Sequence, residues 1–187
     1  MILVIDTSAA TAVVATLNAD RTETFLPSRG ERLRGTLRRI AQQDVTKVAV
    51  VTGPGSFTGL RVGVSFALGL AMGKRIPIVP LPTLEVQAAR SDEQVTAVAD
   101  AGRGRFYFLL PDGRSGVGEP ADIPTTHPLV GRLEQADALI AAGHQFKPEN
   151  ELRRFVDAAA KLLETAPEVP YRNLEIEYMQ SFSPRKV

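Results

Sequence analysis

The chain has 187 residues, of which 44% are hydrophobic and 23% are charged, and its formal net charge is +1. This balance is typical of a soluble globular protein with one large domain or two lobes, and it lacks the strong basic charge of many nucleic-acid-binding proteins. Because the chain contains no cysteine, disulfides, thiolate metal sites and a cysteine nucleophile are excluded. No apolar run approaches the about 18 residues of a membrane span, and the N-terminus has no leader pattern, so we expect a cytoplasmic protein without a membrane contact.

The first half of the chain predicts strands followed by alternating helices and strands. Short β-branched runs bounded by turn residues indicate strands, and longer amphipathic or apolar segments indicate helices. The expected strands cover residues 2–6, 12–17, 23–26, 47–52 and 76–79, the first two forming an antiparallel hairpin. The expected helices cover residues 30–43, 58–73 and 83–90.

The second half repeats part of this plan. Several prolines and the polar run 91–93 indicate a boundary, so we expect an N-terminal lobe over residues 1–90 and an abbreviated C-terminal lobe over residues 91–187. The spacing from Asp100 to the next strand nearly matches the spacing from Asp6, which suggests an internal duplication. The further expected elements are strands at 95–100 and 105–110, a mostly turn-forming region at 113–127 with one short strand, a buried strand at 138–141 and an amphipathic helix at 152–164.

A glycine-rich run lies between a buried strand and a long apolar helix. Residues 53–63 read Gly-Pro-Gly-Ser-Phe-Thr-Gly-Leu-Arg-Val-Gly. A loop that enters a helix N-terminus presents free N–H groups and the positive end of the helix dipole, which suits a phosphate or a carboxylate. The Lys-Ser/Thr pair of a P-loop is missing. Tight turning and close packing of the helix on the sheet explain the glycines equally well.

The helix that follows is apolar around most of its circumference. At about 100° per residue, Arg61 and Ser65 share one narrow polar sector with Met72. Small residues recur at every fourth position in two sets, Gly59, Gly63, Ala67 and Ala71 in one and Gly69 and Gly73 in the other. Backbones can approach closely along both ridges, and we expect one ridge to pack on the sheet. The other side is then either buried under another layer or exposed to a partner.

Two hairpin-led halves, each with an acidic residue at the end of its first strand, resemble the actin, sugar kinase and Hsp-chaperone superfamily. The expected fold is therefore α/β, an actin-like (ribonuclease H-like) pair of duplicated lobes, each a mixed sheet led by an antiparallel hairpin and flanked by helices. In that plan Asp6 and Asp100 face each other across a nucleotide cleft and hold a Mg²⁺-bound phosphate. The turn after Asp6 lacks glycine, so the alternative is that both carboxylates cap turns by accepting backbone N–H bonds. The candidate nucleotide- or anion-binding residues are Asp6, Thr7, Ser8, Gly53, Gly55, Ser56, Gly59 and Asp100.

Three runs carry a more specific resemblance. Residues 5–8, 53–63 and 100–107 resemble the TsaB (YeaZ) family of bacterial tRNA threonylcarbamoyladenosine biosynthesis subunits, and the similarity covers roughly residues 1–110. It implies a noncatalytic scaffold that supports threonylcarbamoyl transfer to the adenosine beside the anticodon. The implied partners are the homologous catalytic subunit TsaD, the ATPase TsaE and, through the complex, tRNA; in isolation the family implies a homodimer.

The resemblance also implies that this chain holds neither a metal nor catalytic residues. TsaD binds its metal through a pair of histidines on its first long helix, whereas the matching segment 30–43 has none. The chain has only His127 and His144, both expected in late loops. We therefore expect no cofactor of its own, with ATP and Mg²⁺ entering at the level of the complex.

The helices at 30–43 and 58–73 correspond to the family's contact with TsaD or with a second copy. The candidate interface residues are Leu33, Leu37, Ile40, Arg61, Val62, Phe66, Leu70 and Met72. Five arginines also crowd the first helix, Arg29, Arg32, Arg34, Arg38 and Arg39. They form either a solvated basic face or a contact for tRNA phosphate or an acidic partner.

Two other functions stay open at this point. One is an actin-fold ATPase or phosphotransferase that uses Asp6, Asp100 and the turn at 53–59. The other is an anion-binding module without a partner, which would stay monomeric and bury its apolar helix.

Overall fold

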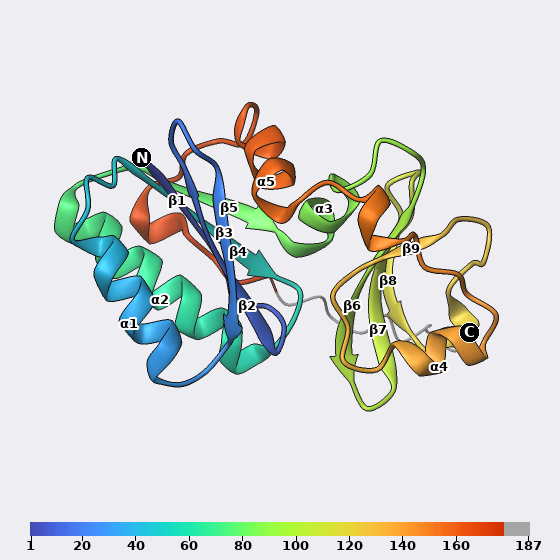
Figure 1. Cartoon of the computed structure of the whole chain (residues 1–187). Coiled ribbons are helices and arrows are strands. Elements are labelled where there is room, and N and C mark those ends of the chain that lie inside the picture. Colours follow the sequence, from blue (N-terminus) through green and yellow to red (C-terminus); the bar gives the residue numbers. More distant parts are fainter. Residues whose placement is uncertain (178–187) are drawn as a thin grey trace.

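The computed structural model describes residues 1–177, which form two α/β lobes side by side (Figure 1). The first sheet has the order β3-β2-β1-β4-β5 and the second has the order β8-β7-β6-β9. The first sheet consists of β1 (Ile2–Asp6), β2 (Thr11–Leu17), β3 (Thr22–Pro27), β4 (Lys47–Gly53) and β5 (Ile78–Pro82). The second consists of β6 (Thr96–Gly102), β7 (Arg105–Leu109), β8 (Ser115–Gly118) and β9 (Leu129–Val130).

The four strands of the second sheet repeat the topology of β1–β4 in the first sheet, which confirms the predicted duplication and fold class; β5 has no counterpart in the second sheet. Strand β1 is antiparallel to β2 and parallel to β4, and β2 is antiparallel to β3. In the second sheet β6 is antiparallel to β7 and parallel to β9, and β7 is antiparallel to β8. Each lobe is thus a mixed sheet that begins with a hairpin, and the acidic residue of each first strand lies near the strand's C-terminal end.

Helices cover both faces of the first sheet. Helices α1 (Glu31–Ala41) and α2 (Phe57–Lys74) lie next to each other on one face, and α5 (Phe155–Leu163) lies on the opposite face (Figure 1). Alternate residues of a strand point to opposite faces, so Leu3 packs with α1 and α2 whereas Val4 packs with α5. Helix α3 (Thr83–Ala88) contacts strands of both sheets and therefore lies at their junction. Among the residues described, no helix combines the length and the apolar character needed to cross a membrane.

The second half differs from the prediction at two places. Residues 138–141, expected as a strand, belong to helix α4 (Ala136–Ala141), in which Leu139 is buried. A short apolar run cannot be assigned to helix or strand by its periodicity alone, and alanine favours the helix. Strand β9 was not predicted, because its two residues are too few to form a pattern. The short strand expected within 113–127 is confirmed as β8.

The chain returns to the first lobe after the second sheet. Val169 forms a β-bridge with Ile78 of β5, and the Glu177 N–H donates to the Thr52 carbonyl at 2.9 Å. The Tyr171 hydroxyl lies within hydrogen-bonding distance of two carbonyl oxygens, that of Ala71 in the last turn of α2 (3.1 Å) and that of Ile76 just after the helix (3.0 Å). The segment after α5 therefore contacts both the first sheet and the C-terminal end of α2. The lobe boundary at residue 90 stays a prediction.

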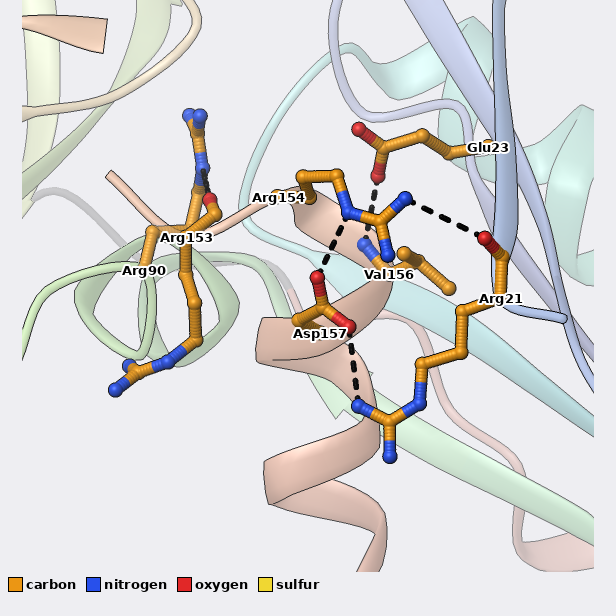
Figure 2. Close-up of polar contacts among 7 residues, drawn as sticks. All are labelled: Arg21, Glu23, Arg90, Arg153, Arg154, Val156 and Asp157. Atoms are coloured by element: carbon orange, nitrogen blue, oxygen red, sulfur yellow. Dashed lines mark hydrogen bonds and ion pairs between the residues drawn. The ribbon is translucent and has the colours of Figure 1, made fainter. Parts of the chain in front are cut away.

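A polar network fixes the N-terminus of α5 to the first lobe (Figure 2). Asp157 accepts hydrogen bonds from Arg154 Nε at 2.8 Å and from Arg21 Nη1 at 3.0 Å. The Glu23 carboxylate on β3 accepts the Val156 N–H at 2.8 Å, which satisfies a donor in the first turn of the helix. These contacts join the edge of the first sheet to a helix more than 130 residues later in the chain.

Candidate functional site between the lobes and on helix α2

A cavity of about 360 Å³ lies between the lobes. Ser8, Gly55 and Ser56 line it from the first lobe, and Asp100 and Glu134 line it from the second. The structure therefore brings together four of the predicted anion-binding residues, from three separate segments of the chain.

Asp6 does not line this cavity. Its carboxylate is buried, forms an ion pair with Arg132 and accepts the Ser8 N–H at 2.8 Å. Arg132 also donates through Nη1 to the Thr11 carbonyl at 3.1 Å, so its guanidinium spans the first hairpin. Sequence reasoning missed Arg132, because it is a single arginine in a loop with no motif around it.

Asp100 faces the cavity and is partly buried. Burial raises the pKa of its carboxyl, the Glu134 N–H bonded to it at 2.9 Å lowers that pKa, and the Glu134 charge raises it. Asp6 therefore accepts a backbone N–H bond from its own turn, as the turn-capping alternative requires, whereas the N–H bonded to Asp100 comes from a residue 34 positions later in the chain. Only Asp100 keeps access to the space between the lobes, so the two carboxylates are not equivalent.

The glycines of the run 53–63 pack against the chain itself. A Cβ on Gly59 would lie 2.0 Å from the Thr7 carbonyl oxygen, and a Cβ on Gly63 would lie 2.3 Å from Thr7 Oγ1. The Thr7 hydroxyl in turn donates to the Gly59 carbonyl at 2.7 Å. A Cβ on Gly55 would lie 2.5 Å from the Ser8 carbonyl oxygen. These contacts support the interpretation in which the glycines allow α2 to approach the β1–β2 turn closely.

The side chain of Ser56 caps the N-terminus of α2. Ser56 Oγ accepts the Gly59 N–H at 3.3 Å, and the Ser56 N–H donates to the Ser8 carbonyl at 2.7 Å. Two donors that an anion could have used are therefore engaged within the chain. A Cβ on Gly53, whose φ is +125°, would lie 2.6 Å from the Glu177 carbonyl oxygen. Anion binding at this turn stays a prediction.

Helix α2 packs one small-residue ridge on the sheet and exposes the other. The set at 59, 63, 67 and 71 is buried, whereas Gly69 and Gly73 are exposed, and a Cβ on either would meet no atom within 4 Å. Val62 is 38% exposed and Met72 is 54% exposed on the same outer side. The Arg61 guanidinium lies 3.5 Å from the centroid of the Phe57 ring, beside a shallow surface hollow. The outer side of α2 thus presents apolar and small residues beside the exposed polar side chains of Arg61 and Ser65.

The predicted interface residues divide into three groups by their exposure. Leu33, Leu37 and Ile40 are buried in the core beneath α1, because their spacing places them on the side that faces the sheet. These three side chains offer no outer surface, which corrects their assignment as contact residues of the folded chain. Phe66 and Leu70 are half-buried against the same core. The exposed candidates are Arg61, Val62 and Met72.

Neither histidine belongs to a metal-binding cluster within the described part of the chain, where no group of three or more His, Cys, Asp or Glu residues is placed to hold a metal ion. His144 is buried on the second lobe, and its Nε2 lies 2.9 Å from the Pro120 carbonyl oxygen. His144 lies in a loop, as the sequence predicts.

Comparisons with known proteins agree on one group. A family model described as TsaD, tRNA N6-adenosine threonylcarbamoyltransferase, matches residues 36–122. The tRNA threonylcarbamoyladenosine biosynthesis protein TsaB of Bacillus subtilis (strain 168) is 40% identical over 81 residues, which cover 42% of this chain and 35% of that protein. The protein of the same name from Escherichia coli (strain K12) is 33% identical over 124 residues, which cover 57% of this chain and 53% of that protein. The chain thus spans about a third to a half of the length of these curated relatives.

A solved structure extends the likeness to nearly the whole chain. YeaZ from Pseudomonas aeruginosa has a TM-score of 0.69 and 18% sequence identity, covering 95% of this chain and 99% of that one. At this identity the likeness concerns the fold, and it includes the abbreviated second lobe.

Proposed function

The chain belongs to the TsaB (YeaZ) family of tRNA threonylcarbamoyladenosine biosynthesis proteins, which is related to TsaD, and from this premise we propose that it is a noncatalytic subunit that docks on TsaD. In this role it supports threonylcarbamoyl transfer to the adenosine beside the anticodon, in the cytoplasm. TsaE, ATP and Mg²⁺ act at the level of the complex, and tRNA is bound through the complex.

The observation that carries this proposal is the exposed side of α2. A glycine inside a helix is about 1 kcal/mol less favourable than alanine, and Gly69 and Gly73 have no neighbour in the described chain that requires them. Small residues four positions apart allow a second helix to approach at a short interaxial distance. Val62 and Met72 add exposed apolar surface beside this ridge. The outer side of α2 therefore suits a helix of TsaD, or α2 of a second copy when the chain is alone.

The state of the cleft supports a noncatalytic role. Phosphoryl-transfer sites of the actin plan need carboxylates that are free to hold a Mg²⁺-bound phosphate. Here Asp6 is ion-paired with Arg132. Thr7 and Ser8 occupy the space beside three glycines of the run 53–63, so a phosphate has no room on that side of them. The rival ATPase would have to use Asp100 and Ser56, which do line the cavity between the lobes.

Association with TsaD tests the proposal most simply. Replacing Val62 by Glu places a charge on the outer side of α2, whereas Ile140→Glu makes the same kind of change at a 56%-exposed position on α4 of the second lobe. We expect Val62→Glu to weaken the binding of TsaD at least about tenfold in sedimentation experiments and Ile140→Glu to leave it unchanged. If both variants bound TsaD equally well, the outer side of α2 would not be the docking surface. ATP hydrolysis by the isolated chain that is abolished by Asp100→Asn would support the rival function.

A further inference from the structure

Arginines predominate on the outer face of α1, which also carries Glu31 and Gly35. At about 100° per residue, Arg32, Arg34, Arg38 and Arg39 occupy a sector of about 160° opposite the buried leucines and isoleucine. Arg29 precedes the helix and is also exposed. We call these five residues the α1 arginine face.

The charge of this face is largely uncompensated. Within residues 1–177, Glu31 pairs with Arg34 at 2.6 Å, and no ion pair is formed by Arg29, Arg32, Arg38 or Arg39. Residues 29–75 contain nine basic and two acidic residues, although the net charge of the whole chain is only +1. Positive charge is therefore concentrated on the side of the first lobe that carries α1 and α2, which favours a polyanionic partner.

The composition of the face favours a phosphate backbone over a protein surface. Protein interfaces are built around buried aromatic or aliphatic anchors, and none of the exposed large apolar residues of the described chain lies on α1. All five cations are arginines, whose planar guanidinium matches two oxygens of a phosphate. Gly35 lies among them and is exposed, and a Cβ there would meet nothing within 4 Å, so the backbone is open to close approach.

We propose that the α1 arginine face binds the phosphodiester backbone of RNA. The inference rests on the proposed function, in which the RNA is the tRNA substrate of the complex. Helix α1 lies beside α2 on the same face of the sheet (Figure 1), so RNA bound here runs next to the surface on which TsaD docks. The face positions the substrate and takes no part in the transfer itself.

The test uses three arginines that form no ion pair. The variant Arg32→Gln, Arg38→Gln, Arg39→Gln removes three charges from the face. The control variant Arg103→Gln, Arg105→Gln, Arg114→Gln removes three charges from exposed positions of the second lobe. Binding of an unmodified tRNA transcript is measured between 50 and 200 mM salt, once for the isolated chain and once for its complex with TsaD. Binding of TsaD and thermal unfolding are measured for each variant.

We expect the α1 variant to bind the transcript at least about tenfold more weakly at 100 mM salt. The slope of log affinity against log salt should fall by about two to three, since each lost phosphate contact contributes about 0.7 to 0.9. The control variant should keep the affinity and the slope of the unaltered chain, and both variants should bind TsaD normally. An unchanged slope in the α1 variant would overturn the inference, as would loss of TsaD binding, which would make the face a protein contact. Failure of the proposed function is a separate result, because it would appear as normal binding of TsaD by the Val62→Glu variant. The salt titration of tRNA binding by the isolated chain could still be interpreted in that case.

Discussion

Arg132 of the second lobe forms an ion pair with Asp6 of the first, at the point where β1 ends. The carboxylate is 1% exposed and the guanidinium is 16% exposed, so both charges are largely removed from water. Arg132 also lies 5.5 Å from the centroid of the Phe155 ring on α5. One side chain thus joins the two lobes and neutralises the carboxylate that an actin-like nucleotide site would need.

Removing this guanidinium should destabilise the chain strongly. Arg132→Gln leaves a buried carboxylate without its counter-charge, for which we expect a loss of about 3 kcal/mol in the free energy of unfolding. Urea denaturation measures this loss. Arg114→Gln is the control, because the exposed pair of Arg114 with Asp112 contributes less than about 1 kcal/mol. A similar small loss for both variants would show that the lobes are joined by other contacts.

Asp100 gives the chain a pH dependence of defined sign. Burial raises the pKa of this carboxyl in the folded chain above its unfolded value of about 3.9. The folded chain therefore binds the Asp100 proton more tightly than the unfolded chain does. Protonation of Asp100 stabilises the fold in acid, and this stabilisation is lost as the pH rises through the folded pKa. We predict that Asp100→Asn raises the urea midpoint at pH 7 and that the gain disappears below about pH 4.

Asp112 provides the matched control for that experiment. Hydrogen bonds from Arg114 lower the pKa of the Asp112 carboxyl, so Asp112→Asn should leave the midpoint at pH 7 unchanged or lower it. If Asp100→Asn lowered the midpoint at pH 7 as well, the hydrogen bond from the Glu134 N–H to the carboxylate would outweigh the cost of burying its charge.

The two glycine ridges of α2 should respond to alanine in opposite ways. Gly59→Ala and Gly63→Ala place a methyl group against Thr7, and we expect each to cost about 3 kcal/mol of stability. Gly69→Ala and Gly73→Ala fill open space in a helix and should each stabilise the isolated chain by about 1 kcal/mol. The same outer substitutions should weaken binding of TsaD. Urea unfolding of the four alanine variants tests the predicted stabilities, and sedimentation with TsaD tests the predicted binding. Normal binding of TsaD by Gly69→Ala and Gly73→Ala would contradict a close contact between α2 and a helix of TsaD.

Tyr171 should hold the C-terminal end of α2. Tyr171→Phe removes the hydroxyl that contacts the Ala71 and Ile76 carbonyl groups, for which we expect a loss of about 1 kcal/mol in urea denaturation. Tyr107→Phe is the control, since the Tyr107 hydroxyl makes no hydrogen bond within residues 1–177. Equal effects would show that the aromatic ring of Tyr171, and not its hydroxyl, secures the segment.

Local patterns explain why much of the first lobe could be predicted. β-Branched runs with turn residues at their ends indicated its strands, and the recurrence of small residues along α2 indicated that one ridge packs on the sheet. The duplicated hairpins indicated the second sheet. Signals of this kind depend on residues within one or two turns of each other, where periodicity is informative.

The missed features depend on contacts between distant residues. The partner of Asp6 lies 126 residues away, and nothing around Arg132 marks it as an interlobe contact. The burial of Leu33, Leu37 and Ile40 follows from their spacing, but an apolar stripe does not show whether it faces the chain's own sheet or a partner. Helix α4 was mistaken for a strand because four apolar residues fit both structures.

The most direct test of the central claim is threonylcarbamoyl transfer to tRNA in a mixture of TsaD, TsaE, the threonylcarbamoyl adenylate and ATP. The mixture is assayed without the chain, with the unaltered chain and with the Val62→Glu and Ile140→Glu variants. We predict transfer with the unaltered chain and with Ile140→Glu, and little or no transfer without the chain or with Val62→Glu. Equal transfer in all four mixtures would contradict the proposal that docking through α2 supports TsaD.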